Sequence, residues 1–98
     1  MVIIIEVKGR TDQAKKALEE IYVKDAGMMM RHISMRTLMD SIVSYQFTRP
    51  ENIYTLTLKQ DWPEHKVQEL VMYLHKDMKK HKCSASDYSI IVYRRMEE

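Results

Sequence analysis

The chain has 98 residues, of which 45% are hydrophobic and 31% are charged, and its formal net charge is +2. These values are typical of one folded domain with a modest core, and they exclude a disordered tail. No apolar run approaches the roughly 20 residues that a bilayer requires, and the lone cysteine, Cys83, fits a reducing compartment. We therefore expect one domain over residues 1–98, a cytoplasmic location and no membrane partner.

The first predicted element is an inner strand over residues 2–8, which is rich in β-branched side chains. Ile3, Ile5 and Val7 fall on one face, and the other face carries Val2 and Ile4. A first helix is predicted after Thr11, whose hydroxyl can cap it. Its apolar residues recur at helical spacing: Ala14, Ala17, Leu18, Ile21 and Tyr22. Gly27 offers a left-handed end to this helix.

From Ile42 the period of the sequence changes to two, which predicts strands. Apolar side chains alternate with polar ones in two runs that are separated by the turn signal Arg49 to Asn52. The apolar positions are Val43, Tyr45 and Phe47 in the first run and Tyr54, Leu56 and Leu58 in the second. The pattern predicts a hairpin of two antiparallel strands.

A second helix is predicted after Asp61, because the run Asp61 to Glu64 has the form of a capping box in which Pro63 occupies the first turn. Its apolar stripe consists of Val67, Leu70, Val71, Leu74 and Met78. We expect this helix to end near Lys82. A last strand is predicted over residues 88–96, with Ile90 and Val92 on one face and Ile91 and Tyr93 on the other.

The order of these elements is strand, helix, hairpin, helix, strand. It matches the α+β plan called ferredoxin-like, or split βαβ, in which two helices cover one face of an antiparallel sheet. The chain is longer than this plan needs, and we expect an extra edge strand or segment around residues 28–39. The sequence therefore predicts a single ferredoxin-like domain.

Three adjacent methionines, Met28, Met29 and Met30, mark this extra segment. Together with His32 they are soft ligands of the kind that Cu(I) prefers. Neighbouring side chains of an extended segment cannot all face one ion, so we expect no metal site here. Methionine fills irregular gaps in cores and also forms adaptable contact surfaces, and both interpretations stay open.

The sequence contains no recognisable catalytic or cofactor motif. The only glycines, Gly9 and Gly27, cannot build a phosphate-binding loop. His75 and His81 do not have the spacing of metal ligands, and Cys83 lacks the further ligands that zinc needs. We expect no cofactor and no metal, and we favour a non-enzymatic protein. A small metal-independent ribonuclease that uses His, Tyr and Arg side chains is the weakest alternative.

One basic cluster lies at the predicted end of the second helix, and it consists of Lys76, Lys79, Lys80 and Lys82. Cations there complement the helix dipole, which explains the cluster without any ligand. Alternatively, these lysines could bind nucleic acid together with Arg94 and Arg95. The two interpretations differ in whether the basic residues share one surface.

The face of the sheet away from the helices is the other candidate surface. It would carry Ile4, Ile91 and Tyr93 among polar side chains, and exposed apolar patches often mark contacts between proteins. A small domain most often covers such a patch by symmetric self-association. We therefore predict a small regulatory or adaptor protein that acts by protein–protein contact, as a homodimer, through these residues or Met28 to Met30. The alternative is a nucleic-acid-binding protein.

Overall fold

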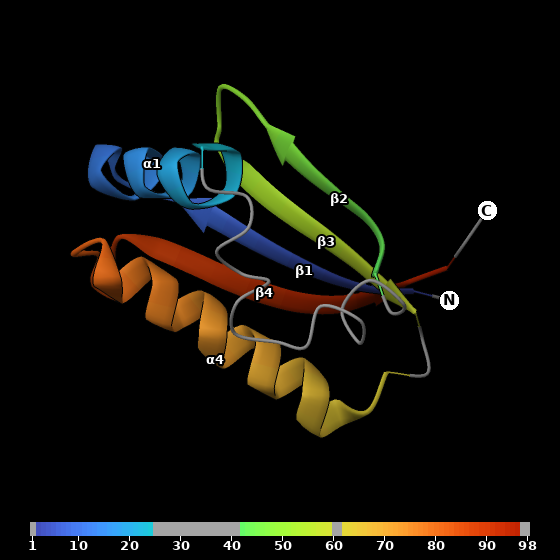
Figure 1. The fold of residues 1–98 in the computed structure, drawn as a ribbon. Helices are drawn as coiled ribbons and strands as arrows, with labels where there is room; N and C mark the ends of the chain where they lie inside the picture. Colours follow the sequence, from blue (N-terminus) through green and yellow to red (C-terminus); the bar gives the residue numbers. More distant parts are fainter. Residues whose placement is uncertain (1, 25–41, 60–61, 97–98) are drawn as a thin grey trace.

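The computed structural model describes residues 2–24, 42–59 and 62–96. In chain order its elements are β1 (Val2–Gly9), α1 (Asp12–Glu19), a π-helical extension η1 (Glu20–Lys24), β2 (Ile42–Thr48), β3 (Ile53–Lys59), α4 (Glu64–Lys80) and β4 (Tyr88–Arg95), as Figure 1 shows. The predicted α+β class is confirmed. The predicted segment at residues 28–39, with Met28, Met29 and Met30, lies outside the described residues, as does Gly27.

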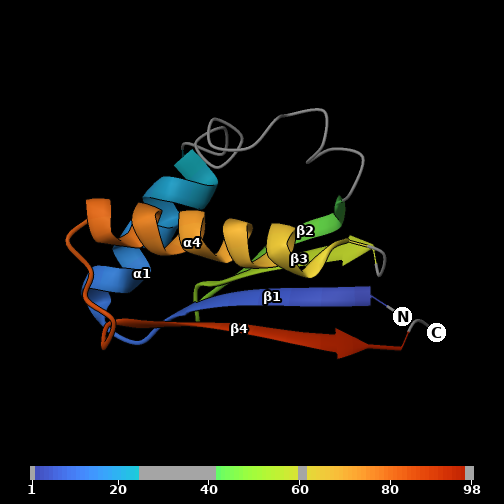
Figure 2. The same cartoon turned by 90° about the horizontal axis from the view of Figure 1, so that it is seen from below.

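The four strands form one antiparallel sheet in the order β2-β3-β1-β4. β1 is therefore an inner strand, as predicted, and it pairs with β3 on one side and with β4 on the other. β2 and β4 are the outer strands. Both helices lie on the same face of this sheet (Figure 2). The opposite face is called the open face below.

The core lies between the sheet and the helices, and the period-two pattern of the sequence determines which strand residues enter it. Alternate residues of a strand point to opposite faces. β1 contributes Ile3, Ile5 and Val7, and β3 contributes Tyr54, Leu56 and Leu58. These are the apolar positions that the sequence predicted for the helix side. Phe47 and Ile90, from the two outer strands, are only partly buried against the core.

The first helix begins as predicted, because the Thr11 hydroxyl accepts a hydrogen bond of 3.2 Å from the Ala14 amide. Ala14, Ala17 and Leu18 are buried, so the apolar stripe faces the core. Gly9 ends β1 directly beneath this helix. A Cβ atom at this position would lie 3.0 Å from the Lys15 nitrogen, so the residue must be small.

The second helix confirms the predicted apolar stripe, since Val67, Leu70, Leu74 and Met78 are all buried. The predicted capping box involves Asp61, which lies outside the described residues. The helix begins at Glu64, and Pro63 is the N-cap residue with an extended backbone and without a side-chain cap hydrogen bond. Proline favours this extended conformation just before a helix. Among the described residues, no helix is long and apolar enough to cross a bilayer.

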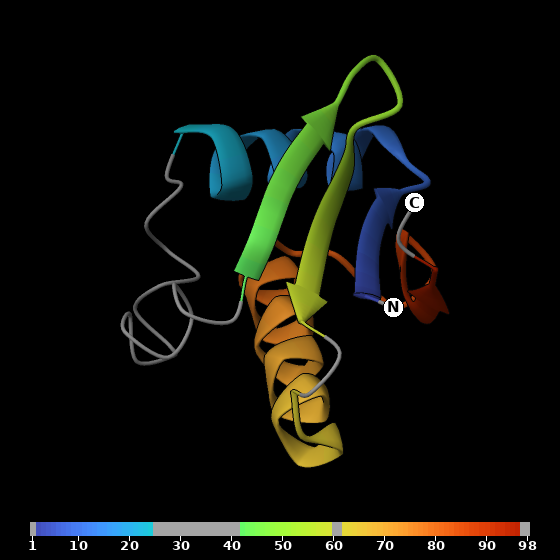
Figure 3. The same ribbon diagram turned by 90° about the vertical axis from the view of Figure 1, so that its right-hand side faces the viewer.

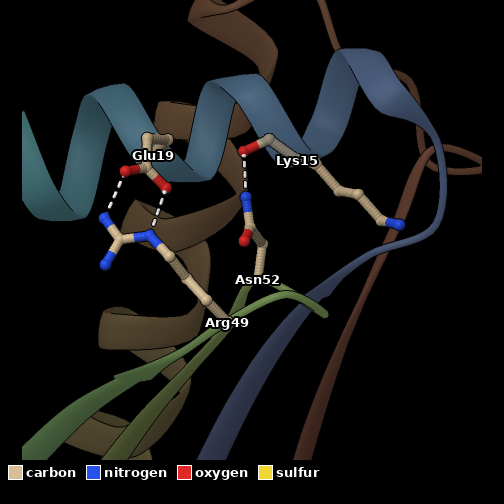
Figure 4. A network of polar contacts seen from close by, with 4 residues as sticks. All are labelled: Lys15, Glu19, Arg49 and Asn52. Carbon is tan, nitrogen blue, oxygen red and sulfur yellow. Dashed lines mark hydrogen bonds and ion pairs between the residues drawn. The ribbon is translucent and has the colours of Figure 1, made fainter.

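The hairpin between β2 and β3 is fastened to α1 by polar contacts (Figure 4). The Arg49 guanidinium binds the Glu19 carboxylate through two nitrogens, and the Asn52 side chain donates a 2.9 Å hydrogen bond to the Lys15 carbonyl. Asn52 has a φ of 55°, in the left-handed region that asparagine tolerates better than most residues. The turn that the sequence predicted is thereby held against the first helix.

Candidate functional site

The outer strand β4 is the part of the sheet that remains open to contact. It pairs with β1 over its whole length without a register shift, from Gly9 opposite Tyr88 to Val2 opposite Arg95. Its other edge has no neighbouring strand in the part of the chain that the structure describes. Figure 3 shows β4 on the far side of β1 from β3, and the second half of β4, residues 91–95, is exposed.

Large apolar side chains are exposed along this strand. The exposed fraction is 51% for Ile91, 45% for Val92, 38% for Tyr93 and 70% for Met96. We call these four residues the β4 surface. Val92 faces the helix side, opposite Ile5, where the sequence predicted a core position. It is nevertheless exposed, because an outer strand lacks a neighbour on one side.

The open face combines β4 with β1 and β3 in rows that follow from the strand registers. Ile4 lies between Thr57 and Tyr93, and Glu6 lies between Thr55 and Ile91. Burial, followed by a hydrogen bond to Glu6, raises the pKa of Tyr93.

The candidate interface residues predicted from the sequence therefore differ in their accessibility. Ile4 is only 1% exposed, so it offers no surface to a partner. Ile91 and Tyr93 are accessible. The sequence analysis missed Val92 and Met96 as surface residues. The split βαβ plan contained the signal for them, because interleaving its two βαβ units places the last strand at an edge of the sheet.

The basic residues fall into two groups that the fold keeps apart. Lys76, Lys79, Lys80 and Lys82 are exposed around the C-terminal end of α4. Arg94 lies at the other end of this helix, where its guanidinium is 3.8 Å from the Glu64 carboxylate. A helix of 17 residues spans about 25 Å. Arg95, the next residue, lies on the open face, where it is opposite Val2. The lysines and the arginines thus do not form one patch.

Polar side chains near the end of α4 hold the fold together rather than line an accessible site. The Tyr88 hydroxyl and the His75 Nδ1 atom are 2.8 Å apart, which joins the start of β4 to α4. Burial, with a smaller effect of Lys79, lowers the pKa of His75. Burial also raises the pKa of Cys83, which disfavours the thiolate that a nucleophile needs.

The described residues contain no group of three His, Cys, Asp or Glu side chains that could hold a metal ion. Among these residues the β4 surface is thus the candidate site that remains. No protein-family model, curated protein or solved structure matches this chain.

Proposed function

We propose that this protein is a small non-enzymatic regulatory or adaptor protein that acts by protein–protein contact through the β4 surface. The observation that carries the proposal is the exposure of Ile91 and Tyr93 on the open face, and of Val92 on the helix side, of one outer strand. Single exposed apolar residues are ordinary, but several along one strand are typical of an interaction site. An outer strand also offers unpaired backbone groups to a partner strand.

The proposed fold plan supports the same surface. β3 lies between β1 and β2, and β1 lies between β3 and β4. Each strand–helix–strand unit is thus split by a strand of the other unit, which is the arrangement of a ferredoxin-like domain. In this plan β4 is an edge strand by topology. The exposure of β4 then follows from the topology of the fold and not from a local irregularity.

A second candidate is binding of nucleic acid by the lysines at the end of α4. Its support is the exposure of Lys76, Lys79, Lys80 and Lys82 within two turns of chain. Phosphate contacts release counterions, so such binding would weaken steeply as salt rises. The helix dipole accounts for the same lysines, and the distance to Arg94 limits the size of the basic patch.

The test is to place a photo-crosslinking amino acid at Val92 and, as a control, at Met72. Met72 is an equally apolar side chain on α4 and is 59% exposed. After irradiation in an extract of cells that contain the protein, we expect protein adducts at position 92 and at least about tenfold fewer at position 72. Equal yields, or no adduct at position 92, would contradict the proposal. The lysine alternative is tested by anisotropy titrations with RNA and DNA at two salt concentrations.

A further inference from the structure

We infer that the partner of the β4 surface is a second copy of this chain, whose β4 strand pairs antiparallel with the first about a two-fold axis at Ile91. The inference rests on the proposed function and names the partner of the same surface. The two sheets would then join into one continuous sheet.

The edge of β4 lacks the features with which proteins usually block strand pairing. Such features are proline, bulges, very short strands and charged side chains in the middle of the edge. β4 has eight residues, contains neither proline nor glycine, and keeps a regular register with β1. Between Tyr88 and Tyr93 it carries no charged residue. This stretch is therefore suited to accept another strand.

Symmetry limits how two copies of β4 can pair. Antiparallel pairing of identical strands requires a two-fold axis perpendicular to the sheet, which leaves both helix layers on the same side. Side chains that oppose each other must point to the same face. Since neighbouring residues point to opposite faces, the axis must pass beside one residue and cannot pass between two. Registers centred on Ile91 or on Val92 both satisfy this condition and keep seven strand residues paired.

The charges at the two ends of β4 select the register. With the axis at Ile91, Arg95 lies opposite Asp87 of the second copy and Arg94 lies opposite Tyr88. The Asp87 carboxylate accepts hydrogen bonds from the Ser84 amide and hydroxyl at 2.7 and 3.1 Å, which favour its charged form. With the axis at Val92, Arg95 would instead oppose Ser89, and Arg94 would oppose the partly buried Ile90. Opposite charges therefore meet only in the first register.

Repulsion between like charges excludes a parallel arrangement. Parallel pairing in register would place Arg94 and Arg95 beside the same residues of the second copy. In the antiparallel register at Ile91, the two copies of Arg94 lie six residues apart along the strands, or about 20 Å. This distance exceeds the screening length of about 8 Å at physiological salt, so their repulsion is small.

The same register covers the apolar residues of the β4 surface. Ile91 would pack against Ile91 of the second copy on the open face, and Tyr93 would lie opposite Ser89. On the helix side, Val92 would lie opposite Ile90, which is already partly buried against the core. Val92, which is exposed in the single chain, would thus gain an apolar neighbour.

Disulfide crosslinking of the purified full-length protein tests both the partner and the register. Cys83 is buried and is replaced by alanine to give a background without thiols. Into this background we place Ile91→Cys, Val92→Cys and, as a control, Met72→Cys. Cα atoms of directly opposed residues lie about 4.5 to 5.5 Å apart, within the range of a disulfide. The two copies of residue 92 would lie beyond about 8 Å, outside this range.

Under mild oxidation we expect the Ile91→Cys protein to form linked dimers at least about tenfold faster than the other two variants. Sedimentation of the unlinked wild-type protein should give twice the mass of one chain. Faster linkage of the Val92→Cys protein would overturn the inference. So would a wild-type protein that stays monomeric at all concentrations while the three cysteine variants link equally slowly. In the second case, adducts at position 92 with a different protein in the extract would still support the proposed function. If no adduct forms at position 92 either, the inference and the proposed function are both contradicted.

Discussion

β1 and β4 lie side by side and are both rich in β-branched residues, yet most of β1 is buried and most of β4 is exposed. Both are rich in isoleucine and valine, and their residues pair one to one along eight positions. Ile5 of β1 is fully buried, whereas Val92, its direct neighbour on the same face, is half exposed. The difference arises from their positions in the sheet, because β1 has a strand on each side and β4 has one. A β-branched strand at an edge gains little stability from its outer side chains, which is why we propose a contact outside the chain for them.

The largest effect that we predict separates the two strands by the same substitution. Ile5→Ala removes a buried side chain from the core and should lower the free energy of unfolding by about 3 to 4 kcal/mol. Ile91→Ala removes an exposed one and should change the stability of the monomer by less than about 0.5 kcal/mol. Urea unfolding at low protein concentration measures both values. Similar losses for the two variants would contradict the contrast between the strands.

The next effect concerns Ile4, which lies on the open face and yet is buried. Ile4→Ala should cost about 2 to 3 kcal/mol, because a side chain enclosed by its neighbours leaves a cavity. Thr57→Ala, at the paired position on β3, is the control, and we expect it to cost less than about 1 kcal/mol. A loss below about 0.5 kcal/mol for Ile4→Ala would show that the open face contributes little to stability, and that Ile4 resembles Ile91.

A smaller effect is expected at the turn of the β2–β3 hairpin, which polar contacts fasten to α1. Asn52→Ala removes the hydrogen bond to the Lys15 carbonyl and places a residue with a Cβ in the left-handed region. We expect a loss of about 1 to 2 kcal/mol. Asn52→Gly loses the bond but tolerates the backbone, so it should cost less. Thermal unfolding of the two variants decides the order, and a more stable alanine variant would contradict this account of the turn.

The smallest effect is a pH dependence at the start of β4. Hydrogen bonds from the Ser84 amide, the Ser84 hydroxyl and the Thr11 hydroxyl lower the pKa of Asp87 below its ordinary value of 3.8. The contribution of Asp87 to stability is thus present above that value and is lost as pH falls through the lower pKa of the folded state. Between about pH 5 and about pH 2, the urea midpoint of the wild type should fall more than that of Asp87→Asn. Parallel curves would contradict this assignment.

Local patterns in the sequence predicted the elements well, because the face of a side chain depends on its neighbours in the chain. The alternation in β3 and the helical stripe of Val67 and Leu70 both hold in the structure. Exposure depends on elements distant in sequence, and it was predicted less well. Val92 has the pattern of a core residue but is exposed on an outer strand, and Ile4 is buried although no helix covers it. The helix start at Glu64 differed because Pro63 takes the extended N-cap position.

Amide hydrogen exchange of the wild-type protein, followed residue by residue at several concentrations, tests most directly whether β4 is a contact strand. β1 pairs with β3 on one side and with β4 on the other, so its amides should exchange slowly at every concentration. Half of the β4 amides point away from β1, and we predict that their exchange slows at least about tenfold as self-pairing increases. Outward amides of β4 that exchange equally fast at every concentration would contradict the pairing of two chains through this strand.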